Sequence, residues 1–467
     1  MIVRSVAKYA VARLTPGLIN FLALALFTRL LTERQYGVYA LVVAGTTLAY
    51  AVTLQWLSLA VLRFSAVATS PRPVFLSTVR RTFLPFAILG AAGLILVARV
   101  SGWEVGWEIL CIGGGLLVVH AWYDLNLMLV TADREPGAYG TLAGIRAVVG
   151  VAIGAGLAAA GGGEVAVLIG VTTGTAMAGA WAWWRRWRGS LGVSGDPALR
   201  AELVHYGLPL AGSYLLDYVV SSSDRLLLGA MLSAAVAGLY APAYDLCQQA
   251  LWATMIVVNL AAYPLAVRAV DEGDPAQRER QLRTHAALLL AVALPSAVGL
   301  AVLAPSVATL LGSRFSPAAG ELIPILAPAI LVGGLKSYYS DLSFQLARAT
   351  KYQLATVAVG ALANLGLNLW WIPVAGIRGA AYATLVAYVA TLIVSWWLSR
   401  RVLPLPIPYG PVAFIALATL GMSGALWLVR DGRGLTVLAG QIGLGMVVYL
   451  GLLMLLVRGR LSRLLAT

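Results

Sequence analysis

Several cationic side chains occur within long apolar stretches of the sequence. They are Lys336, Arg13, Arg146 and Arg225. A charged side chain at the centre of a membrane helix costs roughly 2.5–3.5 kcal/mol on insertion scales, so it tends to face a cavity or a partner. Cations that face a cavity attract anionic groups. For Arg13 and Arg146 the alternative is that the side chain extends to lipid headgroups, and for Arg225 it is an ion pair with a neighbouring helix.

Five aspartates share this apolar setting. They are Asp217, Asp341, Asp124, Asp224 and Asp245. A carboxylate in such a place can bind a coupling ion, or it can gate a path by forming and breaking an ion pair. The alternative is a static ion pair that holds two helices together.

Uncharged polar side chains recur at helical spacing along the same stretches. One stripe comprises Tyr214, Asp217, Ser221 and Asp224, a second includes Tyr240, Tyr244 and Gln248, and a third includes Arg13, Gly17 and Asn20. Lipid does not tolerate such stripes, so several of them together predict a shared aqueous interior. The alternative is hydrogen bonding between helices, at about 0.6 kcal/mol for each contact.

The sequence contains no pattern typical of catalysis or of a bound cofactor. His120 and Asp124 are one helical turn apart, but two groups do not form a metal site. There is no Gly-rich phosphate loop, so the chain itself does not couple ATP. The two cysteines, Cys111 and Cys247, lie in apolar stretches and are expected to be unpaired. We therefore predict a protein that is not an enzyme, with no cofactor apart from a coupling ion, Na⁺ or H⁺.

The elements that carry these residues are predicted to be membrane-spanning helices. The chain has 467 residues, of which 60% are hydrophobic and 11% charged, and its mean hydropathy is +0.85. Apolar runs of about 18–27 residues, long enough for a hydrocarbon core of roughly 30 Å, recur from end to end. We predict an all-α integral membrane protein with about fourteen spans at 9–31, 38–62, 82–101, 108–131, 140–160, 164–184, 207–231, 236–263, 285–311, 321–346, 354–374, 377–399, 411–430 and 435–457.

The distribution of charge predicts the topology. The net charge is +14, and most of the 33 Lys and Arg fall in alternate loops that begin with the N-terminal segment. The positive-inside rule then places both termini in the cytoplasm. This placement accounts for the basic balance without a nucleic-acid partner.

Two pairs of segments resemble each other within the chain. Residues 29–40 and 225–241 both contain a Gly-x-Tyr-Ala turn, and residues 139–166 and 352–381 both run from a Tyr to a Gly-bearing turn. Two matched six-helix halves would produce both offsets, as in transporters built from repeats. The predicted organisation is a six-helix bundle at 1–184, a cytoplasmic linker at 185–206, a second bundle at 207–399 and two additional helices at 411–457.

These segments resemble the polysaccharide-transporter branch of the multidrug/oligosaccharidyl-lipid/polysaccharide exporter superfamily, the Wzx-type flippases. The resemblance is carried by 28–39 (TRLLTERQYGVY), by 206–209 (YGLP) with 223–225 (SDR) and 238–244 (GLYAPAY), and by 364–368 (NLGLN) with 376–381 (GIRGAA). It implies two bundles around a central cavity that work by alternating access. It also implies that the sugar and pyrophosphate head of the cargo crosses in water while its polyprenyl tail stays in lipid.

On this resemblance, the partner is a polyprenyl-pyrophosphate-linked oligosaccharide, the repeat unit of an O-antigen or exopolysaccharide. The expected contacts to its head group are the four cations named above with Asn20, Tyr244 and Gln248, and the five aspartates are the candidates for ion coupling or gating. The protein is expected to lie in the inner membrane of a prokaryote, to act as a monomer and to work with a polysaccharide polymerase.

Three other functions fit parts of the sequence. A lipid II flippase of peptidoglycan synthesis would have the same architecture, and a multidrug/cation antiporter usually has twelve spans. A membrane glycan polymerase or ligase would carry a large outer loop, which this sequence lacks.

Overall fold

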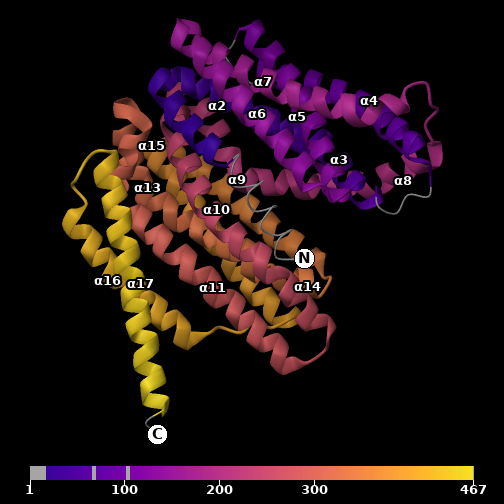
Figure 1. Ribbon diagram of the computed structural model, residues 1–467. Helices are drawn as coiled ribbons and strands as arrows, with labels where there is room; N and C mark the ends of the chain where they lie inside the picture. Colours follow the sequence, from indigo (N-terminus) through magenta and orange to yellow (C-terminus); the bar gives the residue numbers. More distant parts are fainter. Residues whose placement is uncertain (1–16, 66–69, 101–105, 466–467) are drawn as a thin grey trace. The chain divides into compact units, whose positions relative to one another are not determined.

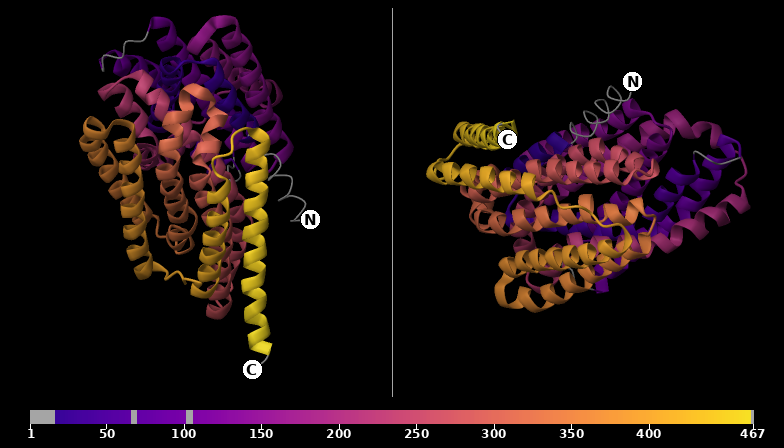
Figure 2. Two further views of the ribbon diagram at one scale, coloured as in Figure 1. Left: turned by 90° about the vertical axis from the view of Figure 1, so that its left-hand side faces the viewer. Right: turned by 90° about the horizontal axis from the view of Figure 1, so that it is seen from below.

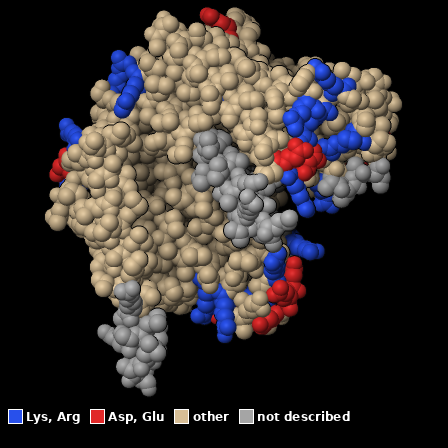
Figure 3. Space-filling model, viewed as in Figure 1, with Lys and Arg blue, Asp and Glu red and all other residues tan. Residues whose placement is uncertain are grey.

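The computed structural model describes residues 17–65, 70–100 and 106–465, and this part of the chain contains helices but no strand (Figure 1). The chain divides into two compact units, and the division falls between Gly238 and Leu239. Figure 3 shows that charged side chains gather in a few groups and leave most of the visible face without charge. Such a surface fits a lipid environment and confirms the all-α membrane fold.

The first unit begins with the helix Gly17–Leu30. Its further helices are α2 (Glu33–Thr53), α3 (Gln55–Phe64), α4 (Arg72–Val100), α5 (Trp107–Ala132), α6 (Pro136–Leu157), η1 (Ala158–Gly162), α7 (Gly163–Ala182), η2 (Trp183–Trp187), η3 (Arg188–Ser190), α8 (Pro197–Gly207), η4 (Leu208–Leu210) and α9 (Ala211–Met231). Helix α10 (Ala234–Asp271) then leads from the first unit into the second.

The second unit continues with helices of very different lengths. They are α11 (Pro275–Val302), α12 (Ala304–Ala308), η5 (Thr309–Leu311), α13 (Gly312–Leu335), η6 (Lys336–Ser340), α14 (Leu342–Leu346), α15 (Thr350–Val402), α16 (Tyr409–Val429) and α17 (Leu435–Leu465). Figure 2 shows α16 and α17 side by side, and the Tyr449 hydroxyl of α17 donates to the Ala291 carbonyl of α11 at 2.8 Å. The two additional predicted helices therefore pack against the second unit.

Within the described residues, ten helical stretches are long and apolar enough to cross a membrane. Two of them, 136–190 and 351–402, each contain two of the predicted spans. In each stretch two helices follow each other directly across a sharp turn at a glycine. The turns have nearly the same backbone: Gly163 has φ 56° and ψ −142°, and Gly376 has φ 55° and ψ −131°. These two glycines lie in the Gly-bearing turns of the similar segments 139–166 and 352–381.

A second pair of positions repeats in the same way. Arg134 precedes α6 with φ 57°, and Arg348 precedes α15 with φ 55°, and these are the only non-glycine residues with positive φ in the described chain. Left-handed conformations are uncommon outside glycine, so their recurrence at matching turns supports an internal repeat. The domain boundaries proposed from the sequence remain predictions. The two compact units divide after α9, whereas the sequence analysis placed the linker at 185–206.

Helix ends differ from the sequence prediction in one consistent way. Helices α4 and α11 begin ten residues earlier than expected, at Arg72 and Pro275, because their basic first turns are helical although they are too polar for the membrane core. Hydropathy marks only the part of a helix that lies in hydrocarbon. The 185–206 segment also contains α8, which begins with Pro197 after the N-cap Asp196, whose carboxylate accepts from the Ala198 and Leu199 amides.

Close packing of small residues holds α6 against α7, which lie beside α5 in Figure 1. A Cβ atom added to Gly170 would lie 2.3 Å from the Gly154 amide nitrogen, and one added to Gly174 would lie 2.5 Å from the Gly150 nitrogen. Within α6, Gly150 and Gly154 are four residues apart, and so are Gly170 and Gly174 within α7. This small-x-x-x-small spacing lets membrane helices approach closely.

Candidate functional site

A buried ion pair forms in the second unit, directly after the end of α13. Lys336 and Asp341 are five residues apart, and the Lys336 Nζ atom lies 2.8 Å from Asp341 Oδ2. Residues five apart diverge by about 140° on an α-helix, but the intervening turn η6 is a π-helix, in which Asp341 N donates to Lys336 O at 2.9 Å. The wider turn therefore places the two charges together.

The pair is almost completely shielded from solvent and is extended by hydroxyl groups. Lys336 is 7% exposed and Asp341 is 2% exposed. The Ser395 hydroxyl of α15 donates to Asp341 Oδ1 at 2.9 Å and lies 2.8 Å from the Ser340 hydroxyl. A buried ion pair needs such additional hydrogen bonds to offset its desolvation. We call Lys336, Asp341, Ser340 and Ser395 the ion-pair network.

The same stretch is fastened to the loop 403–408 that follows α15. The Tyr339 hydroxyl donates to the Pro406 carbonyl at 2.5 Å, and the Ser343 hydroxyl donates to the Leu403 carbonyl at 2.8 Å. The position of the ion-pair network is therefore linked to the connection between the second bundle and its two additional helices.

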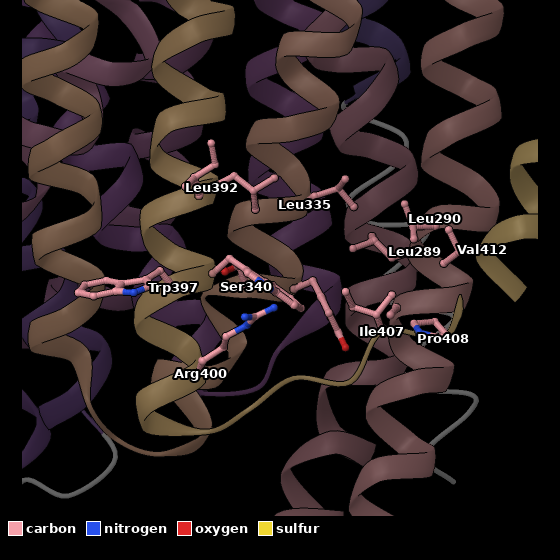
Figure 4. Close-up of a pocket in the computed structure, with 14 residues that line it drawn as sticks. Leu289, Leu290, Leu335, Ser340, Leu392, Trp397, Arg400, Ile407, Pro408 and Val412 are labelled. Carbon is pink, nitrogen blue, oxygen red and sulfur yellow. The ribbon is translucent and has the colours of Figure 1, made fainter. Parts of the chain in front are cut away.

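Beside the network lies an apolar crevice of about 570 Å³ (Figure 4). Its walls come from α11, α13, η6, α15, α16 and the loop 403–408. They are Ala286, Leu289, Leu290, Leu335, Tyr339, Ser340, Leu392, Ile393, Trp396, Trp397, Arg400, Ile407, Pro408 and Val412. In Figure 4 the Arg400 side chain points toward Ser340 and the leucines line the other end. A concave, mostly apolar site with a few polar groups is typical of ligand binding.

Asp124 in the first unit also has specific partners. The helix of the second predicted span breaks at Leu54, between α2 and α3, and Tyr50 on one side of the break donates its hydroxyl to Asp124 of α5. The Tyr50 hydroxyl is also 3.2 Å from Ser58, and its ring meets His120 edge-on at 5.1 Å between centroids. This cluster joins a broken helix to α5 through a carboxylate.

Arg146 of α6 lies close to this cluster. Its guanidinium is 4.8 Å from the centroid of the Tyr123 ring, and Tyr123 is the neighbour of Asp124 in α5. A cation over an aromatic face is attracted to the ring. Arg146 therefore lies beside the aromatic residue that precedes Asp124 in α5.

The remaining predicted residues have varied surroundings. Asp224 is 2% exposed, and its Oδ1 atom accepts from the Arg225 amide at 2.8 Å. Tyr244 is buried with its hydroxyl 3.3 Å from that of Tyr388, whereas Asp245, Gln248 and Arg225 are half-buried and Asn20 is exposed. Arg13 and the side chain of Asp217 lie outside the described residues. The binding and coupling roles of all of these residues remain predictions.

Sequence reasoning missed the groups that complete both clusters. Ser340, Ser395 and Tyr50 are small or aromatic hydroxyl residues in apolar helices, and nothing in their spacing marks them as partners of a carboxylate. No group of three or more potential metal-ligating side chains occurs within the described parts of the chain.

Comparisons with known proteins identify the family and the fold. Residues 26–320 match the family described as polysaccharide biosynthesis protein. A search of curated proteins found none that matches. Among solved structures, the lipid II flippase MurJ in an inward closed conformation has a TM-score of 0.78 at 15% identity, over 97% of this chain and 99% of that chain.

Two further structures share the fold at lower similarity. An inward-facing multidrug resistance MATE family transporter of the MOP superfamily has a TM-score of 0.61 at 15% identity, over 84% of this chain and 97% of that one. A MOP superfamily transporter from Pyrococcus furiosus has a TM-score of 0.56 at 13% identity, over 86% and 94%. The chain therefore belongs to the polysaccharide biosynthesis protein family and has the multi-pass membrane fold of the MurJ and MATE proteins.

Proposed function

We propose that this protein is a flippase that moves a polyprenyl-pyrophosphate-linked oligosaccharide from the cytoplasmic to the outer leaflet of a prokaryotic inner membrane. The family match over more than half of the chain carries this proposal, because it points to polysaccharide assembly. The near-complete structural match to a lipid II flippase supports a lipid-linked cargo of the same general chemistry. The cargo would be an O-antigen or exopolysaccharide repeat unit, released to a polysaccharide polymerase by a monomeric transporter.

We further propose that transport is coupled to Na⁺ or H⁺ through alternating access. The buried Lys336–Asp341 pair supports this part of the proposal, because a cation or proton that binds Asp341 would release Lys336 from its partner. A free lysine would then attract the pyrophosphate of the cargo. The two charges therefore have the chemistry to link ion binding to cargo binding.

The test is transbilayer movement of a fluorescent polyprenyl-pyrophosphate oligosaccharide in liposomes that contain only the purified protein. We expect movement that increases when a Na⁺ or proton gradient is imposed. Movement without any gradient dependence would contradict the coupling but not the cargo. Transport of an organic cation without movement of the lipid-linked sugar would contradict the flippase itself.

A lipid II flippase is a second candidate, favoured by the similarity to MurJ along 97% of this chain. The same liposomes distinguish the two functions when lipid II replaces the oligosaccharide lipid. Faster movement of lipid II would assign the protein to peptidoglycan synthesis. The family match leads us to expect faster movement of the oligosaccharide lipid.

A further inference from the structure

The crevice beside the ion-pair network has the shape and charge of a lipid site. Its apolar walls extend along α15 from Arg400 to Leu392, which is eight residues or about 12 Å at 1.5 Å per residue. The crevice is therefore lined over this length by a membrane-spanning helix, beside which a hydrocarbon chain can lie. The volume of about 570 Å³ lies within the range of small-molecule sites.

One end of the crevice carries a single positive charge. Arg400 lies at this end, and no carboxylate of a described residue lies within ion-pair distance of it. Its nearest aromatic neighbour is Trp396, with the guanidinium 5.8 Å from the ring centroid. Tryptophan and arginine together are typical of the headgroup level of a membrane, and the charge distribution predicts that this end of α15 is cytoplasmic.

We propose that the crevice binds an anionic phospholipid of the cytoplasmic leaflet, with one acyl chain between α11 and α15 and the phosphate group against Arg400. The charge at the mouth favours an anionic over a zwitterionic headgroup. The apolar wall formed by Leu289, Leu335 and Leu392 takes up the chain. This proposal does not depend on the cargo of the transporter.

The inner side of the crevice adjoins the ion-pair network. There the wall includes Ser340, whose hydroxyl pairs with Ser395, and behind them lies the buried Lys336–Asp341 pair. Tyr339, fixed to the Pro406 carbonyl, also lines the crevice. A lipid in the crevice would therefore contact η6 directly. Bound lipid would restrict the movement of η6 and so stabilise the ion-pair network.

The test uses the full-length protein, stripped of lipid in detergent and titrated with phosphatidylglycerol or phosphatidylcholine. Bound lipid is counted by native mass spectrometry, and Tm is recorded in parallel. We expect one phosphatidylglycerol to bind in preference to phosphatidylcholine and to raise Tm, since a ligand of the native state stabilises it. Arg400→Gln should weaken phosphatidylglycerol binding roughly fivefold.

Arg401→Gln is the matched control. Arg401 is the next residue, is exposed and stacks on Trp397 at 3.9 Å, but it does not line the crevice. We expect this variant to bind like the wild type. A second variant, Ile393→Trp, narrows the crevice at an exposed position without changing charge and should also reduce binding.

Several outcomes would overturn the proposal. Equal binding of the two lipids, unchanged binding in Arg400→Gln, or an equal loss in Arg401→Gln would each exclude Arg400 as the headgroup contact. A photoreactive acyl chain should label residues 289–290 and 392–393, and labelling confined to other helices would exclude the crevice. Displacement of phosphatidylglycerol by low concentrations of a polyprenyl phosphate would identify the cargo lipid as the occupant instead.

Discussion

The Lys336–Asp341 pair allows structural and functional roles to be separated by substitution. Lys336→Met leaves a buried carboxylate without its cation, and Asp341→Asn leaves a buried ammonium without its anion. Removing one partner of a buried pair costs roughly 3–5 kcal/mol, whereas replacing both partners is often neutral. We therefore expect both single variants to lower Tm and the double variant to recover it, while transport in liposomes is lost in all three.

The Arg378–Glu321 pair is a suitable control for this series. It has a similar 2.9 Å contact in the same unit, but both side chains are more than half exposed. Exposed pairs contribute about 1 kcal/mol or less, so their removal should change neither Tm nor transport appreciably. Full transport by the Lys336→Met/Asp341→Asn double variant would show that the buried pair is only a structural contact.

The pair also shows how far residue-level prediction reaches. The sequence identified both charges as costly inside a membrane, but it could not pair them, because five residues is the wrong spacing for one face of an α-helix. Only the π-helical turn η6 closes that angle. Asp124 was likewise identified, whereas its partner Tyr50 depends on the break at Leu54, for which hydropathy gives no signal.

At the scale of helices, the contact of α6 with α7 is a direct test of close packing. A Cβ atom at Gly170 would lie 2.3 Å from the Gly154 nitrogen, so Gly170→Ala must push the two helices apart. We expect a loss of roughly 1–3 kcal/mol, measured as a lower Tm of the purified protein. Gly144→Ala is the control, since nothing lies within 4 Å of its added Cβ, and it should be neutral or stabilising. Equal Tm values for the two variants would contradict the packing.

The turn at Gly376 tests backbone strain, whereas Gly170 tests the space available for a side chain. Its φ of 55° and ψ of −131° are strained for any residue with a side chain, although nothing lies within 4 Å of an added Cβ. Gly376→Ala should therefore cost about 1–3 kcal/mol through strain alone. Gly366→Ala lies in the same helix with equally open surroundings and should not lower Tm. An unchanged Tm in Gly376→Ala would show that the turn can relax.

Helix positions were the part of the fold that the sequence predicted best, because twenty apolar residues have few alternatives to a membrane-spanning helix. Helix α8 was missed although Asp196 and Pro197 form a recognisable helix start. The crevice at Arg400 was also missed. It is assembled from α11, η6, α15 and α16, and no local pattern connects residues so far apart in the chain.

For the whole molecule, the proposed alternating access requires some helix contacts to open, and the contact of α2 with the start of α10 is a candidate. A Cβ atom at Gly37 would lie 1.7 Å from the Ala234 carbonyl oxygen, and one at Gly238 would lie 2.0 Å from the Glu33 oxygen. Both glycines belong to the repeated Gly-x-Tyr-Ala motif, which the sequence predicts to be a turn but which lies inside α2 and inside α10. The two helices cannot come this close to each other with a side chain at either position.

Gly37→Ala should therefore disfavour the conformation seen here and shift the population toward one in which this contact is open. With Cys111 and Cys247 replaced by Ser, the variant Ala237→Cys reports the opening, because Ala237 is fully buried in α10 beside Gly238. We expect faster maleimide labelling of this cysteine and slower transport in Gly37→Ala. Gly115→Ala, where an added Cβ meets nothing within 4 Å, should leave both rates unchanged. Unchanged labelling with normal transport in Gly37→Ala would mean that this contact stays closed throughout the cycle, and that the helices open elsewhere.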